Sequence, residues 1–93
     1  MPETTREFNE QRYDELEELY QKLEKAISNP KINPRNIKPS GAAHHYYENS
    51  RRYRYKVGNA KTAIGLISLA INTYCSELMI RRERLEDLLQ TLE

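Results

Sequence analysis

The second half of the chain carries an apolar stripe with almost unbroken heptad spacing, and this pattern constrains the fold more than any other feature. Its steps alternate between three and four residues, which places its members along one side of an α-helix. A continuous helix over this stretch would contain about 50 residues and would be roughly 75 Å long. Only Ser50 and Arg81 interrupt the apolar pattern. The stripe consists of Ala43, Tyr46, Ser50, Tyr53, Val57, Ala60, Ile64, Ile67, Ile71, Tyr74, Leu78, Arg81, Leu85, Leu88 and Leu92.

The pattern predicts an all-α protein, with one small helical domain over residues 1–93. We expect an antiparallel helical hairpin made of a helix at 4–28, a proline-rich linker at 29–41 and one long helix at 42–92. Gly58–Asn59 is the one candidate for an interruption, because Gly can end a helix and Asn can cap the next one. The heptad phase is the same on both sides of it, so we expect a continuous or kinked helix.

The segment before the stripe predicts an amphipathic helix with one buried face. Thr4 and Glu7 fit a capping box, which predicts that this helix begins near Thr4. Its apolar side consists of Phe8, Tyr13, Leu16, Leu19, Tyr20, Leu23 and Ile27. Residues 29–41 then read NPKINPRNIKPSG, and the recurring prolines predict an extended linker. Ile32 and Ile37 are the residues that could hold this linker against the core.

Residues 60–75 are apolar around most of the helix, which indicates burial on several sides. One covering helix cannot bury a surface of that width. We therefore expect a homo-oligomeric bundle whose central contact is 60–75, with two-fold symmetry the commonest arrangement. The segment after Glu77, RRERLEDLLQTLE, has the narrower seam of a coiled coil and is expected to extend that contact.

Charge is distributed unevenly along the chain, although its total is only +1. Residues 1–28 carry a net charge of −4, residues 29–62 a net charge of +7, and residues 63–93 a net charge of −2. This asymmetry indicates a basic surface on the middle segment and an acidic surface on the first helix. The basic surface could bind an anionic ligand, or it could face the acidic first helix of its own or a neighbouring chain. The residues leave both readings open, and they are compatible in part, because some positive charge is left after pairing.

Arginines and tyrosines alternate in the basic segment, and together they offer phosphate pairing and stacking faces. Tyr46 and Tyr53 belong to the stripe and are expected in the core. The candidate ligand-binding residues are those that point elsewhere: Tyr47, Arg51, Arg52, Arg54, Tyr55, Lys56 and Lys61.

Other chemistry has little support in the sequence. His44 and His45 are adjacent, so on a helix they diverge by about 100° and make a poor metal site. Cys75 is the only cysteine and is expected to be a buried structural thiol. No catalytic motif is present, so we expect a protein that is not an enzyme and needs no cofactor. No apolar run approaches the ~20 residues that span a bilayer, and we expect a cytoplasmic location without a membrane partner.

Two segments resemble a known family. Residues 5–8, with Asp14, Leu16 and Leu19, look like the start of the helical hairpin of phage sponges for cyclic oligonucleotide immune signals, of the anti-CBASS or anti-Thoeris type. Residues 65–69, GLISL, are similar to a small and apolar patch in the second helix of that hairpin. The resemblance implies a small, oligomeric, non-catalytic protein that sequesters a cyclic nucleotide between subunits. Thr5 stands where the family's stacking tyrosine is expected and Tyr20 where its phosphate-binding lysine is expected, so no binding residue is transferred.

The function predicted from these features is non-catalytic binding of an anionic, phosphate-bearing ligand, either a nucleotide signal or nucleic acid. The alternative is a protein-interaction module, an inhibitor or adaptor, that acts through the acidic first helix. Glu10, Asp14, Glu17 and Glu18 would form the contact surface in that case.

Overall fold

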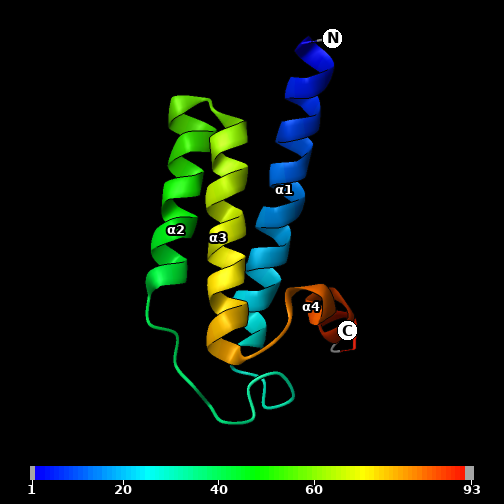
Figure 1. The fold of residues 1–93 in the computed structure, drawn as a ribbon, viewed down its shortest axis with the longest axis vertical. Helices are drawn as coiled ribbons and strands as arrows, with labels where there is room; N and C mark the ends of the chain where they lie inside the picture. Colours follow the sequence, from blue (N-terminus) through cyan, green and yellow to red (C-terminus); the bar gives the residue numbers. More distant parts are fainter. Residues whose placement is uncertain (1, 92–93) are drawn as a thin grey trace.

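A computed structural model describes the backbone of residues 2–91 and the side chains of residues 7–91, and it confirms the all-α class. The α-helices are α1 (Pro2–Ala26), α2 (Ala42–Arg51), α3 (Ala60–Leu78) and α4 (Leu85–Gln90). A π-helix, η1 (Arg52–Val57), continues α2, and a short 3₁₀ helix, η2 (Arg82–Arg84), precedes α4. Helices α1 and α3 run in the same direction and α2 runs against both (Figure 1).

The expectation of one continuous helix over 42–92 is wrong, because the chain reverses direction at Gly58 and Asn59. Gly58 adopts a left-handed conformation with φ 76°, which a residue without a Cβ takes at little cost. The Asn59 side chain then caps α3 by accepting a hydrogen bond from the backbone N–H of Thr62 at 3.1 Å. A second break follows at Met79, which is also left-handed with φ 59°.

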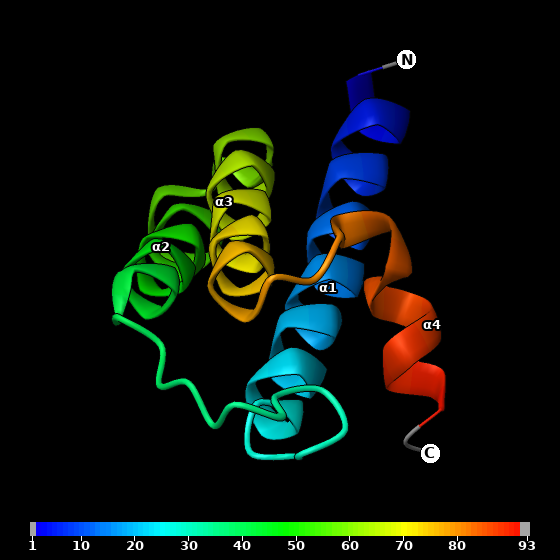
Figure 2. The same ribbon diagram turned by 60° about the horizontal axis from the view of Figure 1, so that its bottom comes forward.

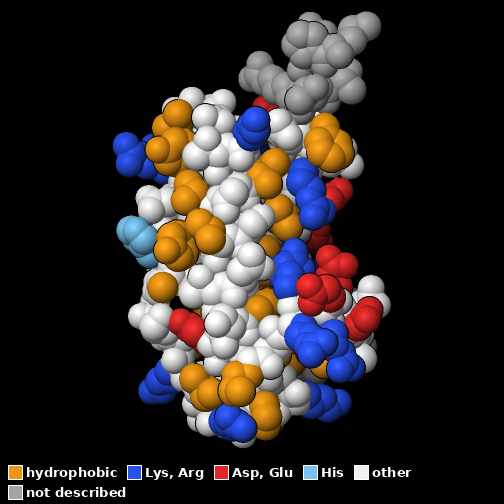
Figure 3. Space-filling model, viewed as in Figure 1, with side chains coloured by type: hydrophobic (Ala, Val, Ile, Leu, Met, Phe, Trp, Pro, Cys, Tyr) orange, Lys and Arg blue, Asp and Glu red, His pale blue; other side chains and the backbone are white. Residues whose placement is uncertain are grey.

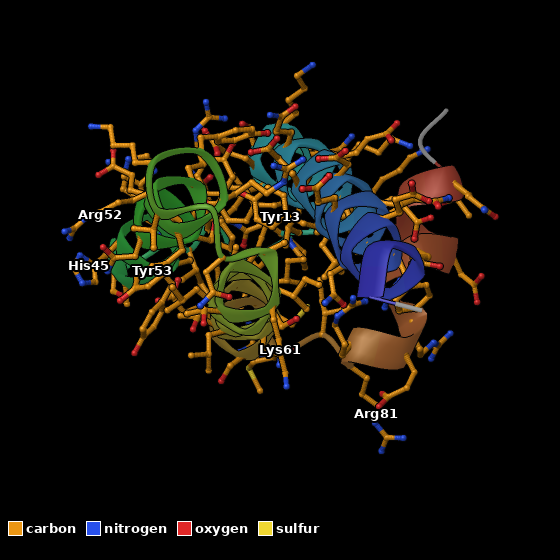
Figure 4. All side chains as sticks on the ribbon, turned by 90° about the horizontal axis from the view of Figure 1, so that it is seen from above. Tyr13, His45, Arg52, Tyr53, Lys61 and Arg81 are labelled. Atoms are coloured by element: carbon orange, nitrogen blue, oxygen red, sulfur yellow. The ribbon has the colours of Figure 1, made fainter. Side chains whose placement is uncertain are left out.

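Helix α3 forms the centre of the fold and packs against both α1 and α2 (Figures 1 and 4). Ala63, Ile67, Ala70 and Ile71 on this helix are fully buried. Residues 60–75 are apolar around most of the helix, and two helices of the same chain cover much of that surface, because α2 folds back instead of extending α3. Burial of this apolar surface therefore does not by itself require a second chain, and the homo-oligomer stays a prediction.

Helix α4 packs against α1 on the side away from α2, as both ribbon views show (Figures 1 and 2). Leu85 and Leu89 are buried there, so the last part of the expected seam contributes to the core of its own chain. Two other predicted core positions are wrong: Phe8 is 65% exposed and Val57 is 54% exposed. Leu92 lies outside the residues that the structure describes.

The linker is more compact than the predicted extended segment. Asn33 is buried and its side chain donates to the carbonyls of Ile27 and Ile37 and accepts from the N–H of Ile37, which closes a loop. Ile32 is buried as expected, but Ile37 is 36% exposed. Helix α1 spans Pro2–Ala26, in place of the predicted 4–28, and the Thr4 side chain of the expected capping box lies outside the described residues.

Candidate ligand-binding site

A groove of about 410 Å³ runs along α2 and η1 and contains most of the predicted ligand-binding residues. Its lining consists of His44, Tyr47, Glu48, Arg51, Arg52, Tyr55 and Lys56. The sequence spacing explains the grouping, since residues four apart lie on the same side of a helix. Tyr47, Arg51 and Tyr55 form one such row, and Arg52 and Lys56 form the row next to it.

The π-helix η1 supplies three of the seven lining residues, Arg52, Tyr55 and Lys56. Such segments are rare, and they occur frequently at functional sites. It ends where Gly58 donates its backbone N–H to the carbonyl of Tyr53. Within this segment Arg52, Arg54, Tyr55 and Lys56 follow one another closely, so the cationic and aromatic groups are concentrated on one end of the α2–η1 rod.

The carboxylate of Glu17 on α1 accepts hydrogen bonds from three residues that line the groove. Its Oε2 accepts hydrogen bonds from Tyr13 at 3.2 Å, from Tyr47 at 3.4 Å and from Arg51 at 3.0 Å. Its Oε1 accepts from Tyr55 at 3.1 Å. The Glu17 side chain is only 14% exposed, so these donors replace most of its hydration. The basic stretch therefore does face the acidic helix of its own chain.

Both arginines that face α1 also lie over tyrosine rings. The Arg51 guanidinium is 5.3 Å from the ring centroid of Tyr55 and 5.9 Å from that of Tyr47. Arg54 lies 5.1 Å from Tyr55 and pairs with Asp14 at 3.8 Å. These are cation–π distances, so the two arginines are held in place by rings as well as by carboxylates.

Burial raises the pKa of two tyrosines in this network, Tyr55 and Tyr13. It raises the pKa of Tyr55 above its ordinary value of 10.0, and the nearby charge of Glu17 raises it further. Burial likewise raises the pKa of Tyr13 on α1. Both hydroxyls donate hydrogen bonds to the carboxylate of Glu17.

The structure corrects the predicted role of Tyr47. Tyr47 is 9% exposed and its ring stacks on Tyr20 of α1 with centroids 4.1 Å apart, so it belongs to the core, although it also lines the groove and its hydroxyl accepts a hydrogen bond from Arg51. Tyr46 and Tyr53, which were expected in the core, are only partly buried. The reason is that α1 approaches α2 from the side of Tyr47, which a pattern within one helix does not specify.

The five cations among the predicted ligand-binding residues fall into three groups. Arg51 and Arg54 are paired with α1, as described above. Arg52 and Lys56 are exposed and make no ion pair within residues 7–91. Lys61 is on α3 and points away from the molecule on a different side from Arg52, so it is not part of the groove (Figure 4).

Glu17 and Asp14 were not predicted as parts of this site. The net charge of −4 over residues 1–28 indicated an acidic partner for the basic segment, but it did not select these two carboxylates. Their selection depends on the height at which α1 packs beside η1. The hydrogen bond at 3.2 Å between Tyr13 and the fully buried Ser50 contributes to that placement.

Other kinds of site have weaker support. No group of three or more His, Cys, Asp or Glu side chains that could hold a metal ion occurs in the described part of the chain. Cys75 is buried, and burial raises the pKa of its thiol. No helix in residues 2–91 is by itself long and apolar enough to cross a membrane, although Ala60–Leu78 and Arg82–Gln90, which meet at 95°, pass that test as a bent pair.

Comparisons with protein-family profiles, with curated proteins and with solved structures gave no match.

Proposed function

We propose that the protein is a non-catalytic binder of a phosphate-bearing anionic ligand, and that the groove on α2 and η1 holds this ligand. The observation that supports the proposal is the pair of exposed, unpaired cations Arg52 and Lys56 in the lining of a groove that also contains Arg51. Arginine and lysine are the usual partners of phosphate oxygens. Tyr55 is 53% exposed, and its ring together with the Arg51 and Arg54 guanidiniums over it supplies planar groups on which a base can stack.

The size of the groove favours a nucleotide over nucleic acid. Its volume of about 410 Å³ is within the range of about 300–1,000 Å³ that is usual for small-molecule sites. A single-stranded nucleic acid would need a longer track of cations, and Lys61 does not extend this one. The phage sponge resemblance supports the same choice, with the chain acting as a sequestering protein in the cytoplasm.

Fluorescence polarisation with a labelled cyclic dinucleotide, a labelled mononucleotide and a labelled single-stranded DNA would test the proposal. Arg52→Ala and Lys56→Ala should each weaken binding about tenfold, which corresponds to about 1.4 kcal/mol. Lys38→Ala, which removes an exposed linker cation outside the groove, should leave binding unchanged. Raising the salt concentration should weaken binding. Absence of binding to all three probes at low salt contradicts the proposal.

A second surface supports the alternative of a protein-interaction module. Asp14 and Glu17 of the expected acidic face are turned toward Arg54 and Arg51. An acidic groove of about 240 Å³ lies instead between α1 and α4, with Glu15, Glu18, Lys22, Glu86, Leu19, Leu89 and Gln90 in its lining. Capture of a basic partner protein that is lost in Glu18→Lys and unaffected by nucleotides would favour this alternative.

We also propose that the chain forms a homo-oligomer, because part of α3 remains open to solvent without a charged side chain. Leu69 is 47% exposed there, in the middle of the helix. This proposal is independent of the identity of the ligand.

A further inference from the structure

The outward side of α3 carries no charged residue between its two ends, Lys61 and Glu77. Charged residues make up 31% of the chain, yet none occurs between Lys61 and Glu77. The middle of α3 in Figure 3 accordingly shows white and orange atoms and no blue or red. The solvent-facing members of this stretch are Thr62, Gly65, Leu69, Asn72 and Ser76. Surfaces without charge are typical of the central part of an interface between proteins.

No contact in the described part of the chain requires a glycine at position 65. Gly65 lies in the middle of a helix, where glycine is less stable than alanine. A Cβ built on Gly65 would meet nothing within 4 Å, so no neighbouring element requires its absence. A glycine on an open helix face does allow the close approach of a second helix. This observation is independent of the missing charge and indicates the same side of α3.

Residues at steps of four form a row along this side of α3. Two copies of the row that run in opposite directions would be complementary to each other. The row consists of Lys61, Gly65, Leu69, Thr73 and Glu77, with Leu69 at its centre. Reversal of the row sets the cation against the anion and Gly65 against Thr73. The Thr73 hydroxyl donates to the carbonyl of Leu69 at 2.7 Å, so it is already satisfied.

The two end charges of this row have no ion-pair partner among residues 7–91. Neither Lys61 nor Glu77 makes an ion pair in the described residues, although Glu77 accepts hydrogen bonds from the backbone and side chain of Ser40. A second copy related by a two-fold axis would supply each of them with a partner.

We propose that two copies of the chain form a dimer through α3, with the two-fold axis at Leu69. Rows at steps of four pack alongside one another when two helices cross at about −50°, the commonest crossing angle in globular proteins. At that angle the two reversed rows run side by side. Leu69 of each copy then meets its equivalent, Gly65 faces Thr73, and Lys61 lies beside Glu77 of the other copy at each end.

The oligomeric state of the wild-type chain and of a variant on the outward side of α3 tests this proposal. Light scattering over a concentration series should show a dimer that dissociates on dilution. Leu69→Asp places a carboxylate next to its own copy and should weaken the dimer at least tenfold. Phe8→Asp is the matched control, because Phe8 is a similarly exposed apolar residue on α1. A wild-type chain that stays monomeric up to millimolar concentration overturns the proposal but leaves ligand binding untouched.

Charge exchange tests the direction of the two rows. Lys61→Glu and Glu77→Lys should each weaken the dimer several-fold, since each places like charges together. The double variant should restore dimerisation, because the pair is reversed at both ends. Failure of the double variant to recover overturns the antiparallel arrangement, and circular dichroism of each variant checks that the helices are retained.

Discussion

Glu17 connects the acidic first helix to the basic face of α2 and η1 through three hydrogen bonds, from Tyr47, Arg51 and Tyr55. A carboxylate that is 14% exposed is costly to bury unless donors satisfy it, and here Tyr13, Tyr47, Arg51 and Tyr55 do so. Three of these donors, Tyr47, Arg51 and Tyr55, also line the groove. This residue therefore stabilises the fold and fixes the positions of Arg51 and Tyr55 for a ligand.

Replacement of Glu17 by Gln should destabilise the protein by about 2 kcal/mol, because the amide carries no charge and its NH₂ group would face hydrogen-bond donors. Urea unfolding followed by circular dichroism measures this change. Glu18→Gln is the matched control, since the Glu18 side chain is 71% exposed and its pair with Lys22 is long at 3.9 Å. Equal stability of the two variants would contradict the assigned role of Glu17.

At the scale of the elements, the turn between η1 and α3 decides the architecture. A heptad pattern reports which side of a helix is buried, and it continues through a turn when both helices direct that side to a shared core. This is the case for α2 and α3, so the unbroken phase did not indicate an unbroken helix. Gly58 and Asn59 were the local evidence in the sequence for a break. The chain does turn at these two residues, although the heptad pattern continues through them.

Two glycines should respond to alanine in opposite ways. Gly58→Ala should destabilise the chain by about 1 kcal/mol, because φ 76° is unfavourable for a residue with a Cβ. Gly65→Ala should raise the stability of the monomer by up to about 1 kcal/mol, since this glycine is within α3 and the added Cβ meets nothing. Thermal unfolding at low protein concentration compares them, and a stabilising effect of Gly58→Ala would refute the assigned turn.

Tyrosines join the helices at the scale of the whole molecule. Tyr20 of α1 stacks on Tyr47 of α2 and lies 5.3 Å from Tyr74 of α3, so one buried ring contacts both of the other long helices. Burial raises the pKa of Tyr20 above its ordinary value, as it does for Tyr13 and Tyr55. The stability of the three-helix core is therefore linked to pH in the alkaline range.

The free energy of unfolding should fall as the pH rises above about 10, the pKa of an unfolded tyrosine. Above that value the unfolded chain loses protons while the folded chain retains them, so the fully buried Tyr13 and Tyr20 each lower the stability by about 1.4 kcal/mol per pH unit until the folded pKa is reached. Below pH 10 the stability contributed by these groups is fully present. Urea unfolding between pH 8 and pH 11 measures the slope, which should decrease in Tyr20→Phe. An unchanged slope in that variant would show that Tyr20 is not linked.

The sequence by itself determined the helical class, the buried sides of α1 and α3, and the opposite charges of the first helix and the basic aromatic segment, because these depend on periodicity and composition. Tertiary structure decided that the long stripe is divided between α2 and α3, that Tyr47 is buried, and that Arg51 and Arg54 are paired with α1 whereas Arg52 and Lys56 are exposed without an ion-pair partner. These outcomes depend on the direction and height at which separate helices meet. Contacts between residues distant in sequence set that geometry, and no pattern within one helix encodes it.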